Sequence, residues 1–128
     1  MKKSIKDYDQ QIDRDKFWSR VSRGEVTDCW EWQGGKNTTG YGLYSLRSPN
    51  WLYERTGRTM TQLLSHRVAW YITKGDIGSD NRVNHLCHHC DNRLCCNPDH
   101  MFIGSMWDNV QDMIDKGRAA WQKTIHKN

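Results

Sequence analysis

Residues 85–100 read HLCHHCDNRLCCNPDH and place four cysteines and four histidines within sixteen positions. This is roughly twice the number of ligands that one tetrahedral zinc ion uses. Cys90 and Cys95 lie five positions apart around DNRL, and His100 lies five positions beyond Cys95, after the turn-forming CNPD. The spacing therefore predicts Cys90, Cys95 and His100 as three of the four ligands of a structural zinc site.

The residues leave the fourth zinc ligand open. Cys87 would complete a compact knuckle with Cys90, Cys95 and His100, whereas Cys29, at the start of CWEWQ, would bring in a distant segment of the chain. Cys29 could equally be a small buried hydrophobic residue, as isolated cysteines often are. Cys96 follows Cys95 directly and would point the opposite way in an extended chain, so we do not expect it to bind the metal.

The composition favours one small domain that needs a stabilising metal. The chain has 128 residues, 36% of them hydrophobic, and a mean hydropathy of -0.94. A chain of this kind builds a small core, which a bound ion would supplement. Five cysteines, four of them crowded into ten positions, indicate reduced thiolates on a metal rather than a disulfide framework. We therefore expect a reducing, cytoplasmic setting.

The charge of the chain indicates a mild preference for polyanions. Nineteen Lys and Arg residues against fifteen Asp and Glu residues give a net charge of +4. The N-terminus, MKKSIKDYDQ, has no apolar run behind its basic residues, and no stretch of the sequence approaches the length of a membrane span. We therefore expect no membrane partner.

Residue patterns predict an α+β fold with a small antiparallel sheet. We expect a loose N-terminus over 1–12, a helix over about 13–23, antiparallel strands at 29–33, 41–46 and 51–55 that form a twisted meander, and a helix over 66–75 with Ser65 as its cap. A strand in RVNHL leads into the metal-rich stretch, and HMFIGS (100–105) returns from it. The last helix is predicted from Ser105, its N-cap, to Lys116 and Gly117, before a basic tail over 118–128.

The metal-rich segment also resembles a known family. HHCDNRLCCNPDHMFIGS, followed by DN and then by DMIDKGR, resembles the zinc-containing branch of the HNH, or His-Me finger, endonucleases, and is similar to the His-Cys box homing endonucleases. FWSRV, CWEWQGG, GYG and HRVAW resemble the N-terminal blocks of small phage-type HNH proteins, so the likeness covers about residues 16–118. It implies a single HNH domain over 1–128, with helix, strands and helix over 13–82 and a zinc-braced ββα-metal core over 83–117.

The resemblance also implies the residues of a nuclease site. The family's catalytic histidine falls on His88, two residues before Cys90, and its metal-binding asparagine falls on Asn109, nine residues after the zinc ligand His100. The family takes its fourth zinc ligand from an upstream strand, which matches Cys29. His85 repeats the same start in HLC, but it lies fifteen positions before His100 instead of the family's twelve, so we prefer His88.

These residues could hydrolyse a phosphodiester. A neutral His88 can take a proton from water, and the amide oxygen of Asn109 can bind Mg²⁺ or another divalent cation. Arg67 is a third candidate catalytic residue, because its guanidinium could hold the phosphate. Basic and aromatic side chains are candidates for binding double-stranded DNA, with salt-sensitive phosphate contacts. They are Arg47, Trp51, Tyr53, Arg55, Arg58 and Arg118.

The expected function is a metal-dependent DNA endonuclease or nickase with one structural zinc and one catalytic cation, working in a phage-infected or prophage-bearing host and possibly as a homodimer. A non-catalytic zinc-knuckle module that binds single-stranded nucleic acid is the main alternative, with Cys87 as its fourth ligand. A degenerate HNH fold that serves as a packaging or repair partner is a third.

Overall fold

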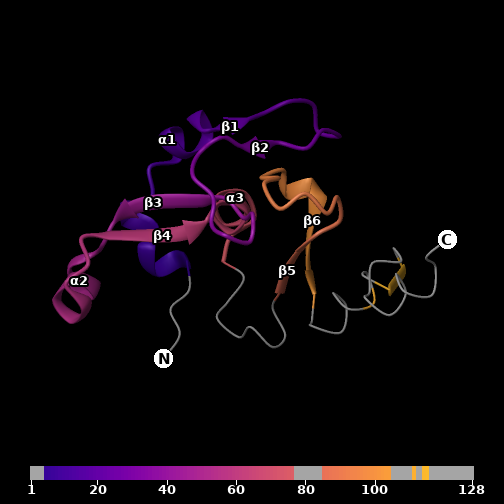
Figure 1. Ribbon diagram of the computed structural model, residues 1–128. Coiled ribbons are helices and arrows are strands. Elements are labelled where there is room, and N and C mark those ends of the chain that lie inside the picture. The colour runs from indigo at the N-terminus through magenta and orange to yellow at the C-terminus, as the bar shows by residue number, and fades with distance from the viewer. Residues whose placement is uncertain (1–4, 77–84, 105–110, 112–113, 116–128) are drawn as a thin grey trace.

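Figure 1 shows the computed structural model of the chain, which describes residues 5–76, 85–104, 111 and 114–115. The elements, in chain order, are the 3₁₀ helix η1 (Ile5–Gln11), helix α1 (Arg14–Ser19), strands β1 (Val21–Ser22), β2 (Glu31–Trp32) and β3 (Leu43–Arg47), helix α2 (Asn50–Thr56), strand β4 (Met60–Leu64), helix α3 (Ser65–Lys74), strand β5 (His85–His88), the 3₁₀ helix η2 (Pro98–His100) and strand β6 (Met101–Gly104). The fold is mixed α+β with small antiparallel sheets, in agreement with the predicted class.

The described strands form three separate antiparallel pairs instead of the predicted meander. β1 pairs with β2, β3 with β4, and β5 with β6. The β3–β4 pair is the longest, with five residues on each strand and Leu43 opposite Leu64. In β5–β6, Cys87 lies opposite Phe102 and His88 opposite Met101, so the predicted outward and return strands around the metal-rich segment are confirmed.

Helix α3 lies at the centre of the molecule, between the β3–β4 pair and the segment that joins β5 to β6 (Figure 1). It contacts η1, β3, β4 and η2. The predicted helix over 66–75 is confirmed, since α3 ends at Gly75, whose φ of +96° suits glycine. Its N-cap is Leu64 instead of Ser65, which is the first residue of the helix. α3 therefore connects the segment that joins β5 to β6, through its contact with η2, to the β3–β4 pair.

Three local predictions are wrong. WLYER (51–55) lies in helix α2 and not in a strand, because Pro49 starts the helix and Gly57, at φ +70°, ends it. The first helix ends at Ser19 instead of near residue 23. Val21, which the prediction places in this helix, belongs to β1 and pairs with Trp32. The N-terminus is not loose over its described part, because η1 occupies Ile5–Gln11 and packs on α3.

An aromatic cluster forms the centre of the core. Phe17 of α1 is fully buried and stacks on Trp32 of β2, with ring centroids 5.2 Å apart. Tyr44 of β3 meets Phe17 edge-on at 5.4 Å. Gly42 lies so close to Trp32 and Ser65 that an added Cβ would collide with both side chains. The cluster therefore joins α1, β2 and β3.

The predicted helix from Ser105 to Gly117 lies mostly outside the described residues. Of its residues, 111 and 114–115 are described, and they are helical. Within the part of the chain that the structure describes, no helix combines the length and the apolarity that a bilayer crossing requires.

Candidate metal centre

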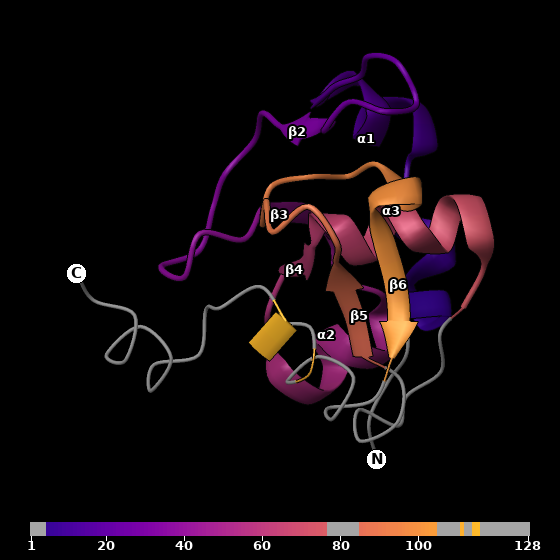
Figure 2. The same cartoon turned by 90° about the vertical axis from the view of Figure 1, so that its right-hand side faces the viewer.

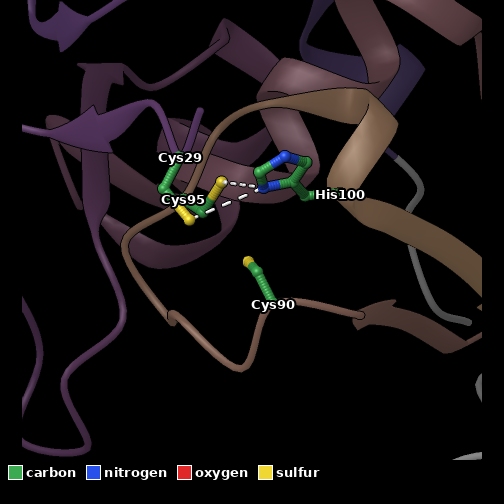
Figure 3. Close-up of side chains that lie close together, drawn as sticks. All are labelled: Cys29, Cys90, Cys95 and His100. Atoms are coloured by element: carbon green, nitrogen blue, oxygen red, sulfur yellow. Dashed lines mark hydrogen bonds between the residues drawn. The ribbon is translucent and has the colours of Figure 1, made fainter. Parts of the chain in front are cut away.

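The metal centre brings together four side chains from two distant parts of the sequence. Cys29 precedes β2, Cys90 follows β5, Cys95 lies in the loop between β5 and β6, and His100 ends η2. Their ligand atoms, three sulfurs and one imidazole nitrogen, all lie within 4.8 Å of one another. Figure 3 shows that the Cys90 sulfur points towards the other three from the opposite side of the cluster.

The distances within this cluster fit a tetrahedral zinc ion. The Nδ1 atom of His100 lies 3.5 Å from the Cys29 sulfur and 3.6 Å from the Cys95 sulfur. For bonds of about 2.3 Å to sulfur and about 2.0 Å to nitrogen, the sulfur and nitrogen ligands of one tetrahedral zinc lie about 3.5 Å apart. Three thiolates and one imidazole are also a common ligand set of structural zinc sites. The cluster therefore fits Zn²⁺ in both spacing and chemistry.

A hydrogen bond holds His100 in the tautomer that a metal requires. Its Nε2 atom lies 3.1 Å from the carbonyl oxygen of Thr27, and a carbonyl can only accept, so Nε2 carries the proton and donates it. Nδ1, which faces the Cys29 and Cys95 sulfurs, is then left with its lone pair. Such an outer contact fixes both the orientation and the basicity of a histidine ligand.

Backbone pairing explains how Cys29 reaches the other ligands. The segment around β2 pairs with residues 89–97, the loop after β5, which we call the zinc loop. The amide of Trp32 donates to the Leu94 carbonyl at 2.9 Å, and the amide of Cys96 donates to the Trp30 carbonyl at 2.7 Å. Glu31 and Cys95 therefore form an antiparallel bridge. Cys29 lies two residues before this bridge, which brings it beside the loop.

Asn97 ties the two halves of the metal centre together. Its side chain is fully buried, and its Nδ2 donates to the carbonyls of Val26 and Asp28, each at 2.8 Å. Its Oδ1 accepts from the amide of Asp99, which caps η2 before His100. Its own amide donates to the Cys95 sulfur at 3.5 Å. One residue thus holds the approach to Cys29, the turn to His100 and the Cys95 sulfur in register.

Burial makes the Cys90 and Cys95 thiols harder to ionise, because it raises the pKa of each. Burial raises the pKa of the Cys95 thiol to about 12, against hydrogen bonds from the backbone of Asn97 and Trp30 that lower it. Burial is also the main reason that the pKa of the Cys90 thiol is raised. A bound Zn²⁺ reverses this balance, because it stabilises the thiolates that burial alone disfavours.

Replacing Asn97 with alanine is expected to weaken both the fold and the zinc site. The change removes a fully buried side chain and the hydrogen bonds that it donates to the carbonyls of Val26 and Asp28, so the free energy of unfolding should fall by about 2–3 kcal/mol. Zinc affinity should fall roughly 10- to 100-fold, as for other outer partners of metal ligands. Urea denaturation and competition with a chelating dye measure the two effects. Asn50→Ala, at an exposed position, is the matched control, and equal stability of the two variants would contradict this role.

The remaining cysteines of the segment lie outside the cluster. Cys87 is buried in β5 and Cys96 is fully buried in the core, and neither belongs to the group of four. The geometry therefore favours Cys29 over Cys87 as the fourth ligand. Cys96 is not a ligand in this arrangement, as expected, and burial raises the pKa of its thiol to about 12. His89 is exposed, and its ring contacts Phe102 at 4.3 Å.

His88 lies directly beside the metal centre, at the end of β5. Its Nε2 lies 2.9 Å from the carbonyl oxygen of Cys95, so Nε2 donates the hydrogen bond and Nδ1 keeps its lone pair. The side chain is half-buried, and burial lowers the pKa of the imidazole, chiefly by disfavouring the charged form. The Cys95 carbonyl thus accepts from one ring nitrogen of His88 and orients the imidazole, as expected for a histidine that acts as a base.

Arg67 is partly buried in the first turn of α3, directly after His66. In the described part of the chain its guanidinium has no hydrogen bond and no ion pair, and burial lowers its pKa while Asp76 opposes this. A partly buried guanidinium without a close anion is suited to bind phosphate. Asn109 and Arg118 lie outside the described residues.

The described residues of the expected DNA-binding set lie on α2 and on its two flanks. Arg47 ends β3, Trp51, Tyr53 and Arg55 belong to α2, and Arg58 follows it. All are exposed except Trp51, whose ring packs 5.7 Å from Tyr8. In Figure 2, α2 lies behind and below the β5–β6 pair.

Two residues of this region, Asn97 and His66, are not among the candidates that the sequence indicates. The signal for Asn97 is its place directly before Pro98, since an asparagine before proline is a recognised place for capping a short helix. The one signal for His66 is its place among the apolar residues of the helix that HRVAW begins.

Comparison with known proteins identifies relatives in a phage. The chain is 37% identical to protein 2.8 of Escherichia phage T7 over 106 residues, and 35% identical to protein 7.7 of the same phage over 102 residues. The chain belongs to the family of these two proteins, which we call the 2.8/7.7 family. The match to protein 2.8 covers 83% of this chain and 63% of the relative, and the match to protein 7.7 covers 80% and 67%. No family model and no solved structure matches the chain.

Proposed function

We propose that this member of the 2.8/7.7 family is a metal-dependent DNA endonuclease or nickase of the HNH type. In this proposal Zn²⁺ on Cys29, Cys90, Cys95 and His100 is structural, and His88 is the general base. The zinc has four protein ligands and so keeps no open position for chemistry. Catalysis then needs a second cation, such as Mg²⁺.

The observation that carries the proposal is the hydrogen bond between His88 and Cys95. The carbonyl that receives Nε2–H belongs to a zinc ligand, so the zinc cage orients the imidazole beside it. A general base must be held in one orientation with a lone pair available, and this arrangement leaves Nδ1 available. A cage that served stability alone would have no need of a histidine fixed in this way.

The strands around the zinc loop support the HNH assignment. β5 and β6 pair antiparallel on either side of the loop, which is the order of the two strands in a ββα-metal motif, and the helix predicted over 105–117 would supply the third element. In the proposal, Asn109 of that helix binds the divalent cation together with the DNA phosphate. The cation supplies charge neutralisation at the phosphate and at the leaving oxygen, while His88 takes a proton from the attacking water.

Cationic residues support DNA as the substrate. Arg67 is partly buried and lacks an ion pair in the described part of the chain, and Arg47, Arg55 and Arg58 are exposed on the α2 flanks. Together with the net charge of +4, they favour a polyanion over a neutral substrate.

A plasmid assay tests the proposal. Supercoiled DNA is incubated with zinc-loaded protein with and without added Mg²⁺, and the zinc content is measured after each reaction. This control matters because a strong chelator such as EDTA also removes Zn²⁺. Nicked or linear DNA only in the Mg²⁺ arm, with zinc retained in both arms, is the expected result. Binding of DNA without cleavage would favour a non-catalytic nucleic-acid-binding module.

A further inference from the structure

Four side chains from three parts of the chain form a continuous stack that ends on His88. The ring of His66, in the first turn of α3, lies 4.7 Å from the ring of His88. The ring of His66 also lies 5.3 Å from the ring of Tyr41, and the guanidinium of Arg93 lies 5.3 Å from the centre of the Tyr41 ring. Arg93 lies in the zinc loop between Cys90 and Cys95, and it also donates to the carbonyl of Thr39. The stack therefore starts and ends beside the metal centre.

His66 is an unusual member of this stack because it is buried without a hydrogen bond. Its side chain is 4% exposed, and its Nδ1 has no partner in the described part of the chain. Burial lowers its pKa to about 3, so the ring is neutral at pH 7. A buried polar atom without a partner has a cost, and an apolar residue would avoid it. Within this group, the ring of His66 contacts the rings of His88 and Tyr41.

The contact supplies a constraint that the hydrogen bond of His88 lacks. One bond from Nε2 to the Cys95 carbonyl fixes a point on the imidazole, but it leaves the ring free to turn about the N–H···O direction. A second ring in contact with the first, with centroids 4.7 Å apart and ring planes tilted by 47°, restricts that rotation. Tyr41 in turn blocks movement of His66 away from His88, and Arg93 holds Tyr41 from the zinc loop.

We infer that His66 is a positioning residue for His88: its ring, backed by Tyr41 and Arg93, fixes the plane of the His88 imidazole while the Cys95 carbonyl fixes its Nε2 atom. The inference deepens the proposed function, since it concerns the residue that acts there as the base. In this inference His66 acts on His88 through the contact of its ring and not through a hydrogen bond. A phenylalanine should therefore replace it, whereas an alanine should not.

NMR of the full-length, zinc-loaded protein tests the inference without any cleavage assay. Long-range ¹H–¹⁵N spectra report the tautomer of each histidine. In the wild type, His88 should show one sharp Nε2–H tautomer, and His66→Phe should retain it. His66→Ala should keep the Nε2–H tautomer, which the Cys95 carbonyl fixes, but should broaden the His88 ring signals, because the ring is then free to turn about that hydrogen bond. Val68→Ala is the matched control, because Val68 is fully buried on the same helix but two positions on, and so faces another way. It should lose stability and keep the His88 signals.

Cleavage kinetics supply the functional readout. His66→Ala should lower kcat about 100-fold through misplacement of the base, with KM and zinc content unchanged, and His66→Phe should restore most of the rate. Unchanged His88 spectra and kcat in His66→Ala would overturn the inference, as would a His66→Phe variant as impaired as His66→Ala. If the wild type cuts no DNA but the spectra change as expected, the proposed nuclease function fails and the positioning of His88 stands.

Discussion

Replacing His88 with alanine is expected to lower the rate of DNA cleavage by at least about 100-fold, and by up to about 10,000-fold if His88 is the general base. The variant should keep its zinc, because the four ligands of the cage are intact. It should also keep its DNA affinity, because phosphate contacts come from cationic residues. Single-turnover cleavage of a labelled duplex, with DNA affinity and zinc content measured on the same preparation, checks all three expectations.

His89→Ala is the matched control for this variant. His89 is the neighbouring histidine, it is exposed, and its ring contacts Phe102 instead of the His88 stack, so cleavage should stay close to the wild-type rate. Robust cutting by His88→Ala would remove His88 from the mechanism. If His85→Ala then failed to cut, the catalytic position would move to the earlier H-x-C start of the segment.

Removal of zinc is expected to have the largest effect on stability. Structural zinc contributes about 10–16 kcal/mol of apparent binding free energy in small zinc-finger peptides, which is comparable with the whole stability of an ordinary domain. Cys29→Ala removes one of four ligands and separates the β2 segment from the zinc loop. If it costs about 4 kcal/mol, the melting temperature should fall by roughly 15 °C. Thermal unfolding followed by circular dichroism, together with the zinc content, measures the effect.

Cys87→Ala separates this expectation from general damage to the cysteine-rich segment. Cys87 is buried in β5 and lies outside the cluster. The variant should therefore lose some stability through poorer packing, but it should keep its bound zinc. The competing knuckle, with Cys87 as the fourth ligand, predicts the reverse pattern. Retention of one zinc by Cys29→Ala, together with its loss from Cys87→Ala, would therefore contradict the assignment of the cage.

The sequence predicts the zinc loop well because local spacing determines it. Cys90, Cys95 and His100 are separated by short turns, so their order along the chain already brings them close. The hairpin of β5 and β6 follows from the same turns. Cys29 is different, since it reaches the site through pairing of β2 with residues 94–96, and no local pattern in the sequence encodes that pairing. From the residues alone, Cys29 and Cys87 stay equal candidates.

Short elements were predicted less well because tertiary contacts decide them. WLYER follows the turn-like SPN and is predicted as a strand, but Pro49 and Gly57 delimit a helix of seven residues. MTQLL was not predicted as a strand, because its residues do not alternate in polarity, yet it pairs along its whole length with β3 as β4. The β1 and β2 strands are only two residues long, so their pairing depends on the aromatic core around Phe17 and Trp32.

The polar residues that orient the site could not be predicted for a related reason. Asn97 and His66 act through groups far away in the sequence: the carbonyls of Val26 and Asp28 for Asn97, and the ring of His88 for His66. An isolated buried polar residue carries no periodicity, and its partner becomes visible only in the fold.

X-ray absorption at the zinc edge tests most directly the claim on which the site depends, that one zinc ion is bound by Cys29, Cys90, Cys95 and His100. On the full-length protein purified with one equivalent of zinc, the cage predicts three sulfur neighbours at about 2.3 Å and one nitrogen neighbour at about 2.0 Å. Cys87→Ala should leave this shell unchanged, and Cys29→Ala should lose one sulfur. An unchanged three-sulfur shell in Cys29→Ala, or a wild-type shell composed mainly of oxygen, would contradict it.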